Sequence, residues 1–418
     1  MNAENTSSLA RSIASLLGCT NTREKIDSNP FFLAELPDVA KLRVIQIMNT
    51  DEKFKLALSS KKMAEYVKIT KANKHFYIVD LNTTEKVKVS RCEKVETLQT
   101  ILGGAQSTKI ASKKECKIWY GNRNLPAAER NVLLIRNIQY VFPFNQFVIM
   151  FRMKKMSENG VRRYLEDRAL ANWKMAIVRT GKIGASDLDA IMDMANKDRS
   201  IALKDVDIPK NYTHANAFKF GSIVYENAEW IRLTDLYSMK NCKAVQLGKN
   251  ALTPDDLNSF LKFCTKSECS MFFTLALNIN AKKRLSVNRV FHEIPVLKYN
   301  RQKHSFYLIA ATNICRIMII YRSYTKGITI WAISPHKSFK LFRSNFEPFT
   351  KEYNVLKMLT EQIELQKELK QLEKTTSEDV TQIIIKKSAI KEKLESVARN
   401  LDSENVYNEN AIHYIAYE

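Results

Sequence analysis

The sequence has 418 residues, 45% of them hydrophobic and 10% aromatic, which is enough for two or three domains with apolar cores. This composition excludes wholesale disorder, and the scarcity of glycine (10) and proline (9) disfavours a loop-rich all-β fold. The formal charge of +22 predicts a basic surface that attracts acidic partners, without choosing among nucleic acid, anionic membrane and acidic protein. A solvated lysine-rich surface also explains this charge.

The seven cysteines are scattered and include no Cys-x-x-Cys pair. This pattern predicts no zinc site and is typical of reduced thiols in an intracellular protein. The polar N-terminus has no signal-peptide pattern, and the most apolar run, residues 306–321, is too short for a membrane span and contains Arg316. We therefore expect a cytoplasmic or nuclear protein, or one found in both places, with no cofactor, no metal and no membrane partner.

The N-terminal part is predicted to have a flexible segment, residues 1–28, followed by a small helical domain, residues 29–70. Pro37 suits the first turn of a helix, where no backbone N–H is needed, and apolar residues then recur at helical spacing. Three short helices of roughly 40 residues make too small a core to bury all this apolar surface, so part of it must meet another domain or protein. The apolar positions are Val39, Leu42, Ile45, Ile47 and Met48, then Phe54, Leu56, Leu58 and Met63.

The middle of the chain, residues 75–345, alternates between strand and helix patterns. Ser186 is predicted to cap one helix, and Thr253 another, with Pro254 at its first position and two carboxylates in its first turn. A short helix is expected within Trp230–Met239. Runs of β-branched and aromatic residues predict strands at His75–Leu81, Lys117–Tyr120, Gln139–Phe142, Phe147–Phe151, Met175–Val178, Ser200–Leu203, Lys243–Leu247, Met271–Leu277, His304–Ile309, Cys315–Tyr321 and Ile328–Ile333.

The spacing of these strands indicates a repeating unit. Met175 lies 26 residues before Ile201, and Ala244 lies 29 residues before Phe273. Units of roughly 20–29 residues, each a strand plus a helix, have the size of leucine-rich repeats, although no regular Leu-x-x-Leu-x-Leu signature occurs. We predict an irregular leucine-rich-repeat-like α/β domain, with an ordinary α/β layer sandwich as the alternative.

The C-terminal part changes character. Apolar residues with a heptad rhythm run through residues 351–402, and Thr375–Asp379 interrupt them. The pattern predicts either a helical hairpin or a short coiled coil through which two copies could associate, followed by a tail at residues 403–418. The fold class is thus α+β and multidomain.

Two motifs resemble known families. Leu36-Pro37, the apolar helix ending at Ile45–Met48, Asp51 with Phe54, and Ser60-Lys61-Lys62-Met63 together resemble an F-box of the nematode type. Glu52 replaces the usual leucine after Asp51, and no tryptophan follows the lysines.

A second motif lies in the middle of the chain and resembles the hallmark of the type-2 F-box-associated domain. It comprises Trp230-Ile231-Arg232-Leu233-Thr234-Asp235-Leu236-Tyr237-Ser238-Met239, then Asn241-Cys242-Lys243, then Leu252 to Lys262. Phe263 and Cys264 stand where family members usually have a tryptophan. Both motifs occur in the order of the family.

The resemblance implies a function in protein degradation. A chain of this kind is the substrate-receptor subunit of a Skp–cullin–F-box ubiquitin ligase complex, works by protein–protein interaction, and performs no catalysis itself. The F-box would bind an acidic Skp-type adaptor, aided by Lys41, Arg43, Lys53, Lys55, Lys61 and Lys62, and the associated domain would bind an unknown target protein. The implied adaptor-binding residues are Leu36, Pro37, Val39, Leu42, Ile45, Ile47, Met48, Phe54, Leu58, Lys61 and Met63.

Two other functions stay open. One is a basic nucleic-acid-binding protein with a helical dimerisation tail, although the basic residues are spread over the body and no recognition motif occurs. The other is an F-box scaffold that acts outside a ligase. No catalytic motif argues for an enzyme, because the six histidines are isolated and no phosphate-binding or nucleophile loop is present.

Overall fold

The computed structural model describes residues 33–70, 76–82, 86–92, 108–109, 119, 124–142, 147–278, 286–301, 304–323, 327–341, 344–374, 380–409 and 412–416. The chain forms two compact units: unit 1 ends at residue 207, and unit 2 begins at residue 208 and also takes in residues 195–198. The division falls inside the segment 75–345 that the sequence analysis treats as one domain. The predicted segment 1–28 lies outside the described residues, as does the strand predicted at 117–120 except for Trp119.

Unit 1 begins with a short helical turn, η1 (Leu33–Glu35), and three helices, α2 (Asp38–Ile47), α3 (Thr50–Ser59) and α4 (Lys61–Ile69). Pro37 lies directly before α2, where its missing N–H costs nothing. The Asn49 side chain caps α3 by accepting from the Glu52 N–H, and the Glu52 carboxylate accepts from the Asn49 N–H. The Ser60 hydroxyl accepts from the Met63 N–H at the start of α4. Capping residues thus set where each helix begins.

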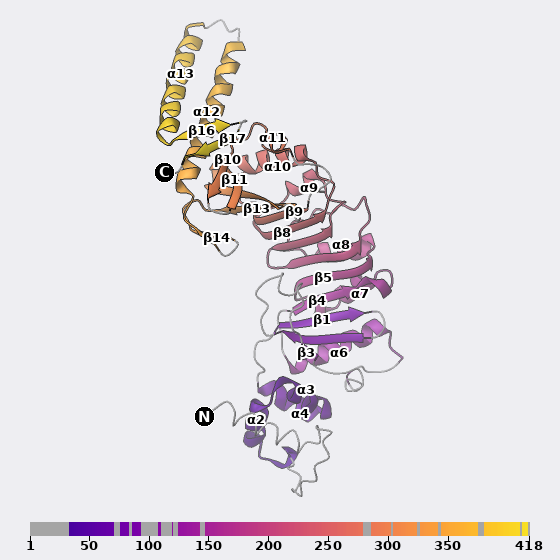
Figure 1. Ribbon diagram of the computed structural model, residues 1–418. Helices are drawn as coiled ribbons and strands as arrows, with labels where there is room; N and C mark the ends of the chain where they lie inside the picture. The colour runs from indigo at the N-terminus through magenta and orange to yellow at the C-terminus, as the bar shows by residue number, and fades with distance from the viewer. Residues whose placement is uncertain are drawn as a thin grey trace. The chain divides into compact units, whose positions relative to one another are not determined.

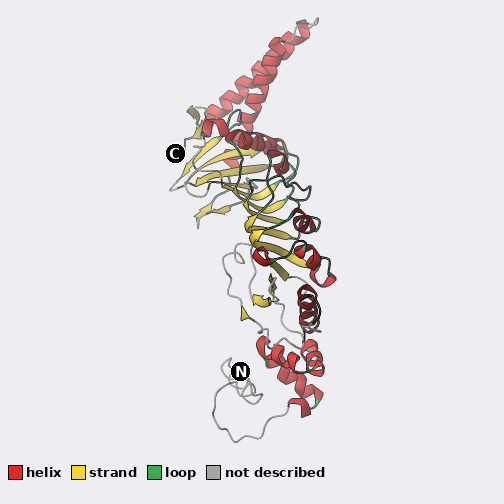
Figure 2. Ribbon diagram, turned by 90° about the vertical axis from the view of Figure 1, so that its right-hand side faces the viewer, coloured by secondary structure: helices red, strands yellow, loops and turns green. Residues whose placement is uncertain are grey.

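The sheet of unit 1 has the strand order β6-β5-β4-β1-β2-β3. β1 pairs in parallel with β4, β4 with β5, and β5 with β6, whereas β1 and β2 pair antiparallel. α7 leads from β4 to β5, α8 leads from β5 to β6, and helices lie along one side of the strands (Figure 2). The bounds are β1 (Phe76–Asn82), β2 (Lys86–Cys92), β3 (Thr108–Lys109), α6 (Ala127–Val141), β4 (Phe147–Arg152), α7 (Gly160–Leu165), β5 (Trp173–Lys182), α8 (Ala185–Met192) and β6 (Ser200–Asp207).

Two predictions in unit 1 are wrong. The strand predicted at Gln139–Phe142 belongs to the end of helix α6, whose buried residues Val132, Ile135 and Ile138 follow a helical period. Ser186 does not cap α8, because the helix already begins at Ala185. Instead the next residue, Asp187, accepts a hydrogen bond of 3.1 Å from the Arg162 N–H and so caps α7. Burial of Asp187 raises the pKa of its carboxyl group.

Unit 2 begins with three parallel strands in chain order, β7 (Ser222–Asn227), β8 (Cys242–Lys249) and β9 (Phe272–Asn278), connected by α9 (Leu233–Leu236) and α10 (Pro254–Lys266). The helix predicted within Trp230–Met239 is thus a single turn. α10 buries Leu257, Phe260 and Leu261. The strand-plus-helix units confirm the α+β class, while the leucine-rich-repeat-like arrangement stays a prediction.

Antiparallel strands continue the sheet of unit 2 from β9, in the order β9-β13-β12-β11-β10, as the sequence predicts for three of them. Two strands at the C-terminus, in the segment predicted to be a tail, extend this sheet beyond β10. The elements are α11 (Val287–Val290), β10 (Leu297–Arg301), β11 (His304–Ala311), β12 (Arg316–Ser323), β13 (Gly327–Ile333), the separate pair β14 (Phe339–Leu341) and β15 (Ser344–Phe346), then β16 (Val406–Glu409) and β17 (Ile412–Ile415).

Two long helices of unit 2, α12 (Thr350–Lys374) and α13 (Val380–Ser403), lie side by side (Figure 1). At their base Leu356 and Leu359 of α12 share an apolar cluster with Val397 and Leu401 of α13, and strand residues of the sheet complete this cluster. Of the two predicted arrangements, the structure therefore contains the hairpin. Self-association through residues 351–402 stays a prediction. Within the described residues, no helix combines the length and the apolar character that a membrane span needs.

A substitution at Gly248, on β8, tests how closely the parallel strands β7 and β8 approach each other. A Cβ atom at residue 248 would overlap the carbonyl oxygen of Glu226, on neighbouring β7. We expect Gly248→Ala to lower the stability of unit 2 by about 1–3 kcal/mol, because the backbone must move to admit the methyl group. A urea titration followed by circular dichroism measures this loss.

Gly184 provides the matched control, because nothing lies within 4 Å of the Cβ that alanine would add there. Gly184 is the N-cap of α8, where alanine is less favourable than glycine, so we expect Gly184→Ala to cost less than about 1 kcal/mol. Equal urea midpoints for the two variants would show that the approach of β7 and β8 at Gly248 is not constraining.

Candidate functional site

The outward side of α2 carries apolar residues that the protein leaves in solvent. The side chains of Val39 and Ile47 are 77% and 48% exposed. Arg43 and Gln46, joined by a hydrogen bond of 3.1 Å, are exposed beside them, and Leu42 is half-buried. We call Val39, Leu42, Arg43, Gln46 and Ile47 the α2 surface. Exposed apolar side chains within a polar rim are typical of a protein-interaction site.

Other apolar residues of α2 and α3 are buried in the protein's own core. Ile45 is fully buried, and Met48, Phe54 and Leu58 are also buried. The Phe54 ring lies 5.4 Å from that of Trp119 and 5.9 Å from that of Phe142 at the end of α6. All four residues, expected from the sequence to bind an adaptor, are therefore buried, and Phe54 packs the helices against Trp119 and Phe142 of unit 1.

The remaining predicted site residues lie at intermediate or exposed positions. Pro37 and Lys61 are exposed, whereas Leu36 and Met63 are half-buried. The structure thus brings Pro37, Val39, Leu42 and Ile47 onto one helix start and its outer side, but it does not place the buried four with them.

Of the six basic residues expected to attract an acidic partner, two are buried and four are exposed. Lys41 and Lys53 are buried; Lys53 donates to the Gln46 carbonyl oxygen at 3.2 Å, and burial lowers the pKa of its ammonium group. Lys41 contacts Asp38 at 3.3 Å. Arg43, Lys55, Lys61 and Lys62 remain exposed. Only these four can act on an approaching partner.

Asp38 joins the first and third helices of this group. Its carboxylate accepts a hydrogen bond of 2.5 Å from the Tyr66 hydroxyl on α4. The bond from Tyr66 and the nearby Lys41 hold the pKa of Asp38 below its usual value. The same bond to Asp38, with burial, raises the pKa of Tyr66. The link fixes the start of α2, so Val39 is presented from an anchored turn.

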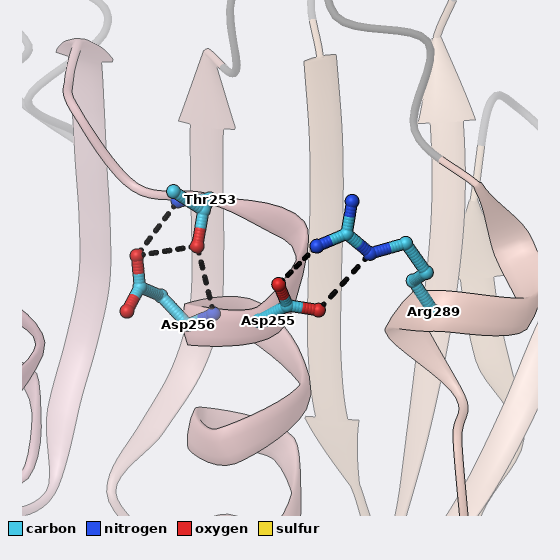
Figure 3. A network of polar contacts seen from close by, with 4 residues as sticks. All are labelled: Thr253, Asp255, Asp256 and Arg289. Atoms are coloured by element: carbon cyan, nitrogen blue, oxygen red, sulfur yellow. Dashed lines mark hydrogen bonds and ion pairs between the residues drawn. The ribbon is translucent and has the colours of Figure 1, made fainter.

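In unit 2 a polar network holds the start of α10 (Figure 3). The Thr253 hydroxyl accepts from the Asp256 N–H at 3.1 Å, and Asp256 accepts from the Thr253 N–H at 2.8 Å. This capping box confirms the predicted role of Thr253. Asp255 forms a two-bond ion pair with Arg289 of α11, which ties a helix 34 residues further on to the same end of α10.

Other residues of the predicted hallmark also support the fold. The buried Asn258 side chain donates to the carbonyl oxygens of Val290 and His292, both at 2.9 Å. The apolar members of the hallmark are buried in the core: Trp230, Leu236, Met239, Leu257, Phe260 and Leu261. These hallmark residues therefore support the fold and do not mark a binding site.

Comparison with known families gives one result. Residues 208–273 match the F-box associated family. The predicted associated domain is thus confirmed over the F-box-associated segment, residues 208–273, which contains the whole hallmark. No curated protein and no solved structure matches the chain.

A cleft of about 510 Å³ opens where the F-box-associated segment ends. Phe273, the last matched residue, lines it together with residues beyond the match, among them Cys315 and Phe339. The Cys315 thiol is exposed, and its Sγ lies 3.7 Å from His336 Nε2. The sequence analysis treated both residues as isolated, because nothing in a spacing of 21 residues signals that they meet. In the described part of the chain, no three His, Cys, Asp or Glu side chains gather to hold a metal.

The described cysteines of unit 2 differ in environment, which predicts their reactivity. Burial raises the pKa of Cys242 to about 11 and raises that of Cys264 further, so at pH 8 both stay protonated and unreactive. We expect iodoacetamide to modify Cys315 at least tenfold faster than Cys242 or Cys264 in the folded chain, as measured by peptide mass spectrometry. Modification of all three at similar rates would contradict the described packing; the denatured chain is the control.

Proposed function

We propose that this chain is the non-catalytic substrate-receptor subunit of a Skp–cullin–F-box ubiquitin ligase, acting in the cytoplasm, the nucleus or both. The single observation that carries the proposal is the match of residues 208–273 to the F-box associated family. That segment follows in sequence a three-helix group whose sequence motif resembles an F-box of the nematode type.

The α2 surface is the proposed docking site for the adaptor. Its apolar residues Val39 and Ile47 remain exposed although unit 1 has a well-filled core, and covering them would remove apolar area from water. The α2 surface includes the exposed Arg43, and exposed Lys55, Lys61 and Lys62 follow it in the sequence. These cations would attract an acidic adaptor at low salt. The adaptor would connect the chain to the cullin.

The role of unit 2 would be to bind a target protein. A receptor of this kind contributes by holding the target near the ubiquitin-charged enzyme at high effective concentration. Bond-making residues are not needed for this.

The test compares adaptor binding by the full chain and by a double variant. We expect Val39→Asp with Ile47→Asp to weaken binding of a Skp-type adaptor by at least about tenfold, because both charges would be desolvated in the interface. Biolayer interferometry at moderate salt measures the affinity. Ile45→Asp is unsuitable, because Ile45 is fully buried and its loss would unfold the helices.

A matched control introduces the same change elsewhere. Ile384 and Ile385 of α13 are 60% and 63% exposed, so Ile384→Asp with Ile385→Asp alters charge and apolar area equally; adaptor binding should stay within about twofold of wild type. Circular dichroism confirms that both variants are folded. The proposal fails when wild type does not bind an adaptor, or when the α2 variant binds as well as wild type.

A further inference from the structure

The topology of unit 2 gathers cations and aromatic rings at one end of the sheet. Because β12 and β9 both pair antiparallel with β13, the beginning of β12, the end of β13 and the beginning of β9 lie at the same end. Arg316 opens β12, Ile333 closes β13, and Phe273 lies at the beginning of β9. These residues line the cleft of about 510 Å³, a volume in the range of ligand-binding clefts.

The cleft combines an apolar wall with positive charge. The Phe273 side chain is 50% exposed, and Phe339, the first residue of β14, forms another part of the wall. Arg316 and Lys337 also line the cleft, and its described lining residues include no carboxylate. Neither cation forms an ion pair with another residue of the described structure. Within the described residues, the cleft therefore presents two cations without an ion-pair partner beside an exposed aromatic ring.

We propose that this cleft binds an acidic peptide segment of the target protein, with one aromatic side chain of that segment against Phe273 and Phe339 and flanking carboxylates on Arg316 and Lys337. Charge complementarity selects this occupant: Arg316 can receive a carboxylate in two-bond geometry, and aromatic rings pack favourably on one another. The proposal rests on the proposed function, because it names where that function's target binds. Most of the lining lies beyond the F-box-associated segment, so sequence differences there could change the target while the family hallmark stays intact.

The probe is a fluorescein-labelled peptide, Gly-Asp-Glu-Phe-Asp-Glu-Gly, titrated with the full chain by fluorescence anisotropy. One comparison peptide replaces the four carboxylates with lysines, and another replaces Phe with Ala. We expect the acidic peptide to bind at least tenfold more tightly than either at low salt, and its affinity to fall as salt screens the exposed charges. If the acidic peptide binds no more tightly than the lysine peptide, the proposal is overturned.

Variants locate the binding. Arg316→Gln with Lys337→Gln should weaken the acidic peptide by about tenfold or more, because the carboxylates lose charged partners. Lys370→Gln with Lys386→Gln removes the same charge from exposed positions of α12 and α13 and should change affinity by less than about twofold. Equal weakening by both pairs would indicate a general charge effect and overturn the site.

Cys315 supplies an independent readout, because its exposed thiol lines the same cleft. A saturating acidic peptide should slow iodoacetamide modification of Cys315 several-fold, and leave the partly exposed Cys269 as the internal reference. An unchanged Cys315 rate overturns the proposal. So does a 12-nucleotide single strand of DNA that binds more tightly than the peptide and loses affinity in the Arg316 and Lys337 variant, since the cleft would then serve nucleic acid.

Adaptor binding is measured on the same Arg316 and Lys337 variant and should equal that of wild type. If the chain binds the adaptor but shows no preference for the acidic peptide, the peptide-binding role of the cleft is overturned and the proposed receptor function stands. Peptide binding in the cleft by a wild-type chain that cannot bind an adaptor would overturn the receptor function and leave the cleft.

Discussion

Parallel strand pairing constrains most of this chain. Two parallel neighbours cannot be joined by a tight turn, so each needs a crossover that returns the chain to the same end of the sheet. Here α7 and α8 perform this task in unit 1, and α9 and α10 in unit 2. Each crossover must start at a fixed place, which explains the polar caps: Asp187 on the start of α7, and Thr253 with Asp256 on α10. The hallmark of the F-box-associated segment includes Thr253 and Asp256, the residues that set where the crossover helix α10 begins.

The N-terminal helices contain both buried residues that stabilise the fold and exposed apolar residues that do not. A helix of ten residues has room for one buried stripe, and in α2 that stripe runs through Lys41, Ile45 and Met48. Its apolar residues outside the stripe, Val39 above all, gain nothing from the protein's own fold. Their exposure is unfavourable for an isolated chain and becomes favourable once a partner covers them. This is the physical reason to look for the adaptor on the outer side of α2.

Sequence reasoning succeeded where a local pattern determines the structure. Thr253-Pro254 with two carboxylates is sufficient to start a helix, and the strands from Phe306 to Ile333 follow from β-branched runs. It failed where distant contacts decide: Gln139–Phe142 has strand-like composition but completes α6 because Val141 and Phe142 are buried on that helix's inner side. It also could not separate Val39 from Ile45, since both fit one apolar stripe and only the folded structure shows that Ile45 is buried and Val39 is exposed. The meeting of Cys315 and His336, and the cleft beside them, depend on strand order that no local pattern encodes.

The central claim is that one chain connects an adaptor to a target through two separate surfaces. Native mass spectrometry of the full chain mixed with a Skp-type adaptor and the acidic peptide tests this most directly. The account predicts a species containing all three components, with the peptide present in the same proportion whether or not the adaptor is bound. Species that contain adaptor or peptide but never both would contradict it, because a receptor must hold its two partners at the same time.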